Sequence, residues 1–181
     1  LYVHQPVGDF VGAWKDMEKA VKMGKVRTLG ISNFDANDEV FNEIMEKSTI
    51  KPAVLQMECH PYAQRVEMRK KAAKYGIQVE CWYPLGGAQS QGLLLRDPVI
   101  NKIAKAHGKS PAQIILRWHI QEGFSVIPGA TNPDYIKENI QIFDFALTDD
   151  EMQQIRSLNK EQRIFNATLD DVKKMVWGTK L

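Results

Sequence analysis

Short apolar runs alternate with longer amphipathic stretches throughout the chain, and this alternation constrains the fold more than any single motif does. The runs begin near Leu1, Arg27, Ala53, Gln78 and Ser125, so successive starts are 26, 26, 25 and 47 residues apart. Each of the first three intervals has room for one strand, one helix and two short loops. Strands joined through helices lie parallel, because right-handed crossovers bring them side by side in the same direction. The sequence therefore predicts an α/β fold with a parallel sheet.

Helical spacing and capping residues place helices between these strands. The first three helices are predicted from apolar stripes, namely Phe10, Trp14, Met17 and Val21, then Val40, Phe41, Ile44 and Met45, then Met68, Ala72 and Tyr75. The long fourth interval holds two helices, the second of which starts at the cap Ser110. A further helix after Pro133 is expected to turn Ile136 and Ile140 inward, and a capping box at Thr148 starts another.

Two architectures have a parallel sheet of this kind. An open doubly wound sheet that binds a nucleotide needs a glycine-rich phosphate turn, and the sequence contains neither GxGxxG nor GxxxxGK[ST]. The alternative is a section of a (β/α)8 barrel, which takes about 250 residues when complete. Since the chain has 181 residues and Leu1 already lies inside an apolar run, we expect only the later part of a barrel.

Charge and cysteine usage exclude several classes of function. Lys and Arg total 24 against 22 for Asp and Glu, and the two signs are interleaved, so nucleic acid is not an expected partner. No apolar run approaches the roughly eighteen residues of a membrane span, and no leader precedes the first motif, so we expect a cytoplasmic protein without a membrane partner. Cys59 and Cys81 lack zinc-site spacing and are expected to stay reduced, with no metal bound.

Polar residues gather where the predicted strands end, and in α/β barrels the chemistry lies at the C-terminal ends of the strands. The five strand ends are His4-Gln-Pro6, Gly30-Ile-Ser-Asn-Phe34, Gln56-Met-Glu-Cys-His-Pro-Tyr62, Trp82-Tyr-Pro-Leu-Gly86 and Val126-Ile-Pro-Gly-Ala-Thr131. A histidine, a Ser–Asn pair, a glutamine and a tryptophan are thus expected to face one mouth of the barrel.

In this order the five segments resemble the aldo-keto reductase family over residues 1 to 165, most closely its bacterial diketogluconate-reductase-like members. The segment at His4 resembles the family's fourth barrel strand, and the other four resemble its fifth to eighth. The resemblance implies strands 4 to 8 of a (β/α)8 TIM barrel over 1–165, with the N-terminal strands missing and a C-terminal arm over 166–181. Closure removes sheet edges, so this chain is expected to have two open edges and to self-associate, whereas the parent protein is expected to be a monomer.

The resemblance implies reduction of an aldehyde or ketone, a small-molecule carbonyl substrate, to an alcohol with NADP or NAD as cofactor. The family's catalytic set is Asp, Tyr, Lys and His, and only the histidine has a match here. By position it is His4, which would orient the carbonyl and help set proton transfer to its oxygen. The other three are expected upstream of Leu1, so the chain by itself is expected to be incomplete and inactive.

The cofactor residues carry over more fully. Ser32 and Asn33 match the pair that holds the nicotinamide carboxamide, and Gln56 matches the glutamine that completes the contact. Trp82 matches the aromatic residue on which the nicotinamide ring stacks. Leu85 lies where the backbone meets the pyrophosphate.

At the adenosine end, Glu138 and Asn139 match the pair near the adenine. The family commonly has Lys, Ser and Arg to bind the 2′-phosphate of NADP, and this chain has Gly129, Ala130 and Tyr135 at those places. Each charge-assisted hydrogen bond contributes roughly 1.5 to 3 kcal/mol, so the substitutions disfavour NADP.

Two other functions remain open from the residues. One is a non-catalytic cofactor-binding or regulatory protein of the same fold. The other is an unrelated barrel enzyme such as an isomerase, which would need a phosphate-binding turn that residues 128–131 match poorly. His60 is interpreted as structural, His107 and His119 as helix residues, and Trp14 and Trp118 as core.

Overall fold

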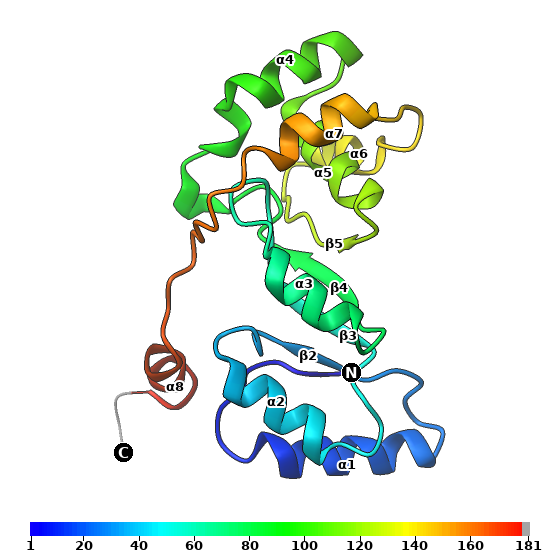
Figure 1. Cartoon of the computed structure of the whole chain (residues 1–181), viewed down its shortest axis with the longest axis vertical. Coiled ribbons are helices and arrows are strands. Elements are labelled where there is room, and N and C mark those ends of the chain that lie inside the picture. The colour runs from blue at the N-terminus through cyan, green and yellow to red at the C-terminus, as the bar shows by residue number, and fades with distance from the viewer. Residues whose placement is uncertain (179–181) are drawn as a thin grey trace. The chain divides into compact units, whose positions relative to one another are not determined.

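The computed structural model describes residues 1–178, and within them it contains a five-stranded sheet (Figure 1). The strands are β1 (Tyr2–Val3), β2 (Gly30–Ser32), β3 (Val54–Glu58), β4 (Gln78–Trp82) and β5 (Ser125–Val126). They lie in the order β1-β2-β3-β4-β5, with parallel pairing of β1 with β2, β2 with β3, and β4 with β5. The expected α/β fold with a parallel sheet is therefore confirmed.

Residues 1–178 also contain eight α-helices and two short 3₁₀ helices, of which α6, α7 and α8 follow the last strand. They are α1 (Phe10–Lys22), α2 (Asp38–Lys47), α3 (Val66–Ala73), η1 (Ala88–Ser90), η2 (Leu94–Arg96), α4 (Pro98–His107), α5 (Pro111–Gln121), α6 (Pro133–Ile140), α7 (Asp149–Arg156) and α8 (Leu169–Trp177). The predicted caps are confirmed, since Ser110 and Thr148 each form a reciprocal capping box at α5 and α7. No helix within residues 1–178 combines the length and the apolar character that crossing a bilayer requires.

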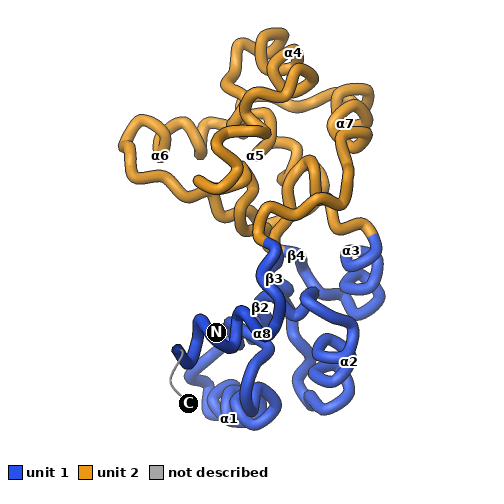
Figure 2. The backbone as a smooth tube through the Cα atoms, turned by 90° about the vertical axis from the view of Figure 1, so that its left-hand side faces the viewer, with its two compact units in different colours: residues 1–57, 67–79, 166–181 blue, residues 58–66, 80–165 orange. Residues whose placement is uncertain are grey.

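The chain divides into two compact units, shown in Figure 2. Unit 1 comprises residues 1–57, 67–79 and the chain from 166 onward, and unit 2 comprises 58–66 and 80–165. The chain thus leaves unit 2 at residue 165, where the sequence predicts the boundary between a barrel and a C-terminal arm. That boundary stays a prediction.

Unit 1 is built around the large apolar side chains of α1, α2 and the strands. Trp14 is 1% exposed, as predicted for a core residue, and its indole nitrogen donates to Glu18 Oε1 and to the carbonyl of Ile50. Glu18 Oε1 in turn accepts from the backbone N–H groups of Thr49 and Ile50, at 2.7 and 2.8 Å. A buried carboxylate therefore ties α1 to the turn that follows α2.

Unit 2 buries one face of α4 and most of α5. Trp118, Ile114 and Ile100 are all fully buried, so the predicted core role of Trp118 is confirmed. The residues after β4 wind through η1 and η2 into α4, and α5 then leads into β5. This arrangement places the ends of β4 and β5 and the start of α5 in the same unit.

The inward orientation predicted for α6 is wrong. Ile136 and Ile140 are 54% and 70% exposed, and no residue of α6 is buried. The helix is held to α5 by polar contacts instead: Gln113 Nε2 donates to the carbonyls of Glu138 and Gln141. Successive residues of an α-helix are 100° apart, so Glu138 lies on the side of α6 opposite Ile136 and Ile140. When Gln113 binds the carbonyls of Glu138 and Gln141, the side of α6 that carries the two isoleucines therefore faces outward.

A second apolar stripe is also less buried than its spacing predicts. Tyr75, which continues the stripe of Met68 and Ala72, is 51% exposed because α3 ends at Ala73 and the chain turns before it. Its ring still lies 6.1 Å from that of Phe41. In the C-terminal arm, α8 buries Val172 and leaves Trp177 47% exposed.

Candidate functional site

A chain of hydroxyl and amide groups lies at the C-terminal ends of the first three strands, in unit 1. Ser32 faces Gln56 across the β2–β3 pair, and its hydroxyl donates to Gln56 Oε1 at 3.3 Å. Asn33 Nδ2 lies 3.2 Å from Ser32 Oγ and 3.3 Å from the backbone carbonyl of His4. The structure thus brings together Ser32, Asn33 and Gln56, as the parallel register requires.

Backbone conformation explains the residue type after β2. Asn33 has φ of 62°, in the left-handed region that asparagine tolerates better than most residues. This turn directs its amide back toward β1. His4 is exposed and contributes its carbonyl to the cluster, so its ring is left to face solvent. The cluster can offer donors and acceptors to a carboxamide.

Trp82 ends β4 in unit 2 and is half-buried between two other rings. The Tyr83 ring lies 4.7 Å away and the Phe165 ring 5.5 Å away, both edge to face. Tyr83 has φ of 51°, and its ring would come within 2.7 Å of a Cβ at Gly87. Only glycine at 87 therefore leaves room for this aromatic arrangement.

The other predicted cofactor residues line one cavity of about 850 Å³, also in unit 2. Its walls come from the turn after β4, the N-terminal turn of α5, the segment after β5, and α6. The lining residues are Leu85, Leu95, Ser110, Pro111, Ala112, Gly129, Ala130, Thr131, Asn132, Tyr135, Glu138 and Asn139. Three predicted cofactor residues and all three positions of the replaced phosphate-binding set therefore meet at one place.

Glu138 is the only charged residue among the described residues that line this cavity. Its carboxylate accepts a hydrogen bond from the hydroxyl of Ser110, the cap of α5. A Cβ added at Gly129 would meet no atom within 4 Å, so the backbone there leaves open space rather than demanding glycine. The cavity is thus apolar with a few amides and hydroxyls and one carboxylate, and the lining described here has no cation for a phosphate.

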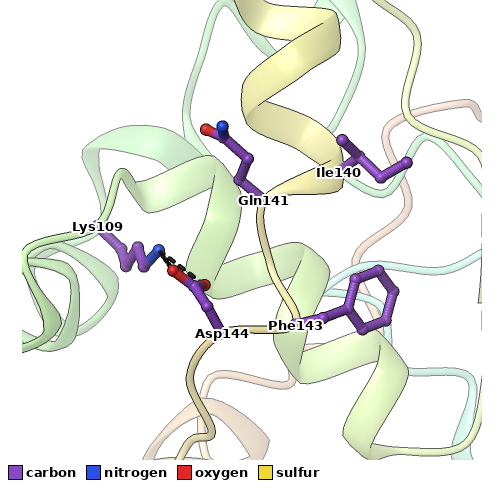
Figure 3. A pocket seen from close by; sticks show the side chains of 5 residues that line it. All are labelled: Lys109, Ile140, Gln141, Phe143 and Asp144. Atoms are coloured by element: carbon purple, nitrogen blue, oxygen red, sulfur yellow. Dashed lines mark hydrogen bonds and ion pairs between the residues drawn. The ribbon is translucent and has the colours of Figure 1, made fainter.

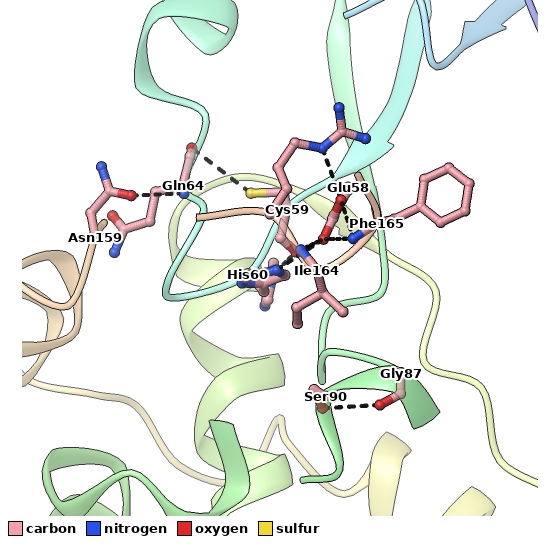
Figure 4. A network of polar contacts seen from close by, with 11 residues as sticks. Glu58, Cys59, His60, Gln64, Gly87, Ser90, Asn159, Ile164 and Phe165 are labelled. Carbon is pink, nitrogen blue, oxygen red and sulfur yellow. Dashed lines mark hydrogen bonds and ion pairs between the residues drawn. The ribbon is translucent and has the colours of Figure 1, made fainter. Parts of the chain in front are cut away.

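A buried carboxylate, that of Glu58, lies at the end of β3 (Figure 4). Glu58 is completely buried and accepts hydrogen bonds from Arg163 Nε at 2.9 Å, from Ile164 N at 2.6 Å and from Phe165 N at 3.2 Å. His60 Nε2 lies 3.2 Å from the same carboxylate. Burial alone would raise the pKa of Glu58, but these hydrogen bonds outweigh it and lower the pKa to about 2. Glu58 is therefore ionised, and it is a residue that the sequence analysis did not single out.

The remaining histidines and a tyrosine have structural contacts. His60 pairs with Glu58 as the structural interpretation expects, and the ring of His107 lies 2.9 Å from Glu151. Tyr62 donates to Asp97 at 2.6 Å, and burial together with that bond raises the pKa of Tyr62 to about 12. A tyrosine held in this way stays protonated and braces α4 rather than giving up its proton.

His119 forms a buried group that spacing in the sequence could not reveal. The ligand atoms of Cys59, Cys81 and His119 all lie within 4.8 Å of one another, and all three residues are buried. The two ring nitrogens of His119 lie 2.8 Å from the carbonyl of Ile115 and 3.1 Å from that of Cys59. Because the imidazole is directed at backbone carbonyls, it braces α5 against the end of β3 rather than presenting a lone pair to the thiols.

A second hollow, of about 520 Å³, lies beside the end of α6 (Figure 3). It is lined by Lys109, Ile140, Gln141, Phe143 and Asp144. Lys109 Nζ lies 2.6 Å from Asp144, and this hydrogen bond lowers the pKa of the Asp144 carboxyl. The two charges in the hollow therefore neutralise each other, and the first cavity is the better candidate for binding an elongated polar ligand.

Comparison with known proteins gives a consistent result. The model of the "Aldo/keto reductase family" matches residues 1–160. The chain is 41% identical over 155 residues to the 9,11-endoperoxide prostaglandin H2 reductase of Trypanosoma cruzi, covering 86% of this chain and 54% of that protein. It is 41% identical over 161 residues to aldo-keto reductase family 1 member A1 of Gallus gallus, covering 86% and 49%. The chain thus spans about half the length of these curated relatives.

Solved structures agree with the sequence relatives. The D53A mutant of Gox0644 in complex with NADPH superposes with a TM-score of 0.85 at 36% identity, over 93% of this chain and 61% of that one. MGS-M4, an aldo-keto reductase enzyme from a Medee basin deep-sea metagenome library, superposes with a TM-score of 0.87 at 34% identity, over 93% and 62%.

Proposed function

Because the chain belongs to the aldo-keto reductase family, we propose that it contributes to the NAD(P)H-dependent reduction of an aldehyde or ketone to an alcohol. The five strands correspond to strands 4 to 8 of a (β/α)8 barrel in this proposal. The substrate is a small carbonyl compound.

The cavity of unit 2 is the observation that carries the proposal. Leu85 and the pair Glu138–Asn139 are about fifty residues apart in the sequence, yet they line the same space. Its volume of about 850 Å³ falls within the roughly 300 to 1,000 Å³ of small-molecule and cofactor sites. Amide and hydroxyl groups set in apolar walls suit an adenosine, which needs a few directed hydrogen bonds and a large apolar contact.

The charge of the cavity indicates which dinucleotide it prefers. A 2′-phosphate carries one to two negative charges and is normally bound by Arg or Lys. Gly129, Ala130 and Tyr135 offer no positive charge, and Glu138 repels an anion. We therefore infer that the site binds NAD(H) at least as well as NADP(H).

Within unit 1, the polar cluster of Ser32, Asn33 and Gln56 offers by itself the groups that suit a carboxamide. Ser32 and Gln56 can hydrogen-bond a carboxamide, because their own mutual bond at 3.3 Å is long and easily exchanged. Trp82 offers a ring for stacking, worth roughly 0.5 to 1.5 kcal/mol beyond burial. When bound, the reduced nicotinamide supplies a hydride to the carbonyl carbon.

His4 is the residue of this chain assigned to the reaction itself. Its exposed ring can hydrogen-bond the carbonyl oxygen and keep it oriented while that oxygen takes up a proton. No tyrosine of the chain matches the family's proton donor: Tyr62 is tied to Asp97, and Tyr83 packs against Trp82. We therefore propose that the isolated chain binds cofactor without reducing carbonyls. A non-catalytic cofactor-binding protein of the same fold is the second candidate, and it is favoured by the same observation.

Filling the cavity tests the proposal directly. Ala112 lines the cavity in the first turn of α5, so Ala112→Trp places an indole in the space assigned to adenosine. Ala106→Trp, at an exposed position of α4, is the matched control. Calorimetric titration with NADH should show at least tenfold weaker binding for Ala112→Trp and unchanged binding for Ala106→Trp. Equal affinity in both variants would show that the cofactor does not bind in this cavity.

A further inference from the structure

Three of the donors that satisfy Glu58 come from one short segment of the chain. Arg163, Ile164 and Phe165, which we call the 163–165 segment, bind the carboxylate through one side chain and two backbone N–H groups. The segment lies about a hundred residues from Glu58 in the sequence. Charge-assisted bonds are roughly twice as strong as neutral ones, so this carboxylate fixes the position of the segment closely.

The side chains of the same segment contact the turn that follows β4 from two sides. The Phe165 ring lies 5.5 Å from the Trp82 ring at an interplanar angle of 76°. Ile164 Cδ1 would come within 3.0 Å of a Cβ added at Gly86, so it lies directly against that glycine. The segment thus connects Glu58 to both ends of the Trp82–Gly86 turn, and Figure 4 shows Phe165 beside the carboxylate.

We propose that Glu58 is a positioning residue for the cofactor: it holds the 163–165 segment so that Phe165 sets the orientation of the Trp82 ring. The inference rests on the proposed function, in which Trp82 stacks on the nicotinamide ring. Glu58 itself touches neither cofactor nor substrate. Its effect passes through the backbone of Phe165 to the phenyl ring and from there to the indole.

A purely structural role for Glu58 makes a different prediction, and the chain offers a matched control for it. Glu18 is also a buried carboxylate that accepts from two backbone N–H groups and one side-chain N–H. Its partners are Trp14, Thr49 and Ile50, none of which belongs to the proposed cofactor site. Replacing either glutamate by glutamine removes a buried charge, but only Glu58→Gln loosens the contact with Trp82.

Comparing NADH with ADP-ribose separates positioning from stability, because ADP-ribose lacks the nicotinamide. Calorimetric titration should show that Glu58→Gln binds NADH about two- to tenfold more weakly and binds ADP-ribose with unchanged affinity. Phe165→Leu, which leaves the carboxylate network in place, should show the same selective loss even if Glu58→Gln folds poorly. Glu18→Gln should change neither affinity. In a Trp82→Ala background, Glu58→Gln should cause no further loss.

Two results would overturn the inference. One is an equal loss of both ligands in Glu58→Gln and in Phe165→Leu, and the other is an NADH affinity that neither variant changes. Failure of the proposed function has its own signature. If the wild-type chain binds NADH no more tightly than ADP-ribose, the nicotinamide does not stack on Trp82. If it binds neither ligand, the chain has no cofactor site. Either result also overturns the inference about Glu58.

Discussion

Introducing a lysine at position 129 should convert the cavity into one that accepts a 2′-phosphate. A Cβ at Gly129 would meet nothing within 4 Å, and the position does not need a left-handed backbone, so Gly129→Lys costs little in packing. The new ammonium group would face a cavity whose described lining has one carboxylate and no cation. NADP(H) carries the 2′-phosphate that this charge can bind, whereas NAD(H) does not.

The size of the effect follows from two opposing terms. A hydrogen bond to a charged group contributes about 1.5 to 3 kcal/mol. Immobilising the lysine side chain costs about 0.5 to 1.5 kcal/mol, which leaves roughly 1 kcal/mol, or about a fivefold gain in affinity. NADPH should therefore bind about fivefold more tightly to Gly129→Lys than to the wild-type chain, while NADH affinity stays within about twofold.

Fluorescence titration of both reduced cofactors measures this ratio, and Ala106→Lys on the exposed face of α4 controls for the added charge. An equal gain in the control would mean that net charge alone attracts the cofactor. If NADPH affinity does not rise above that of the control, then position 129 does not face the 2′ position and the placement of the adenosine is wrong.

Four further predictions concern the rest of the chain. Trp82→Ala should weaken NADH binding by about 1 kcal/mol. An unchanged dissociation constant in the same titration would show that Trp82 is a core residue and not part of the cofactor site. The pKa of Glu58 is lowered from 4.5 to about 2, so ionised Glu58 stabilises the fold above pH 4.5 by about 3 kcal/mol and this contribution is lost as the pH falls toward 2. Urea unfolding should therefore show the stability difference between wild type and Glu58→Gln shrinking over that range; a difference that is independent of pH would contradict the ionised network. β1 and β5 are the edge strands of the sheet, and Leu1 and Ile127 beside them are 59% and 45% exposed. Because open edge strands pair with other chains, the chain should self-associate at micromolar concentration. A monodisperse monomer in a sedimentation experiment would refute this. The purified chain should not oxidise NADH with an aldehyde at an enzymatic rate, and steady turnover would show that it carries its own proton donor.

The elements of the fold could be predicted because their signals are local. Each strand lies in a short apolar run, and the helices after Ser110 and Thr148 begin at capping boxes that three or four residues define. The sequence predicts only a C-terminal arm over 166–181, whereas the structure forms α8 there, with a capping box of the same kind made by Thr168 and Asp171.

The orientation of α6 could not be predicted because it depends on a competition between distant groups. The spacing of Ile136 and Ile140 is that of a buried face, and burying them would have gained free energy. The amide of Gln113, some 25 residues earlier, needs the carbonyls at the end of α6, and satisfying it turns the helix the other way. Such a pairing is visible only in three dimensions.

The candidate site shows the same division between local and distant signals. The resemblance of five ordered motifs was enough to group Ser32 with Gln56, which the structure joins by a hydrogen bond across neighbouring parallel strands. It also assigned Leu85 and Glu138 to one ligand, and both line the same cavity. Glu58 was passed over, because its main partners lie about a hundred residues further along the chain. A charged residue between the apolar residues Met57 and Cys59, at the end of a buried strand, is the signal that could have identified it, since a buried carboxylate must find donors.

The most direct test of the account is to map where a nicotinamide dinucleotide binds this chain. Backbone amide spectra recorded during NADH titration should show saturable shifts at Ala130, Asn132 and Asn139 around the unit 2 cavity. The same residues should respond to NADPH no more strongly than to NADH at equal concentration. Shifts confined to the hollow beside Lys109 and Phe143, or no saturable shift at all, would contradict the assignment of the cavity to the cofactor.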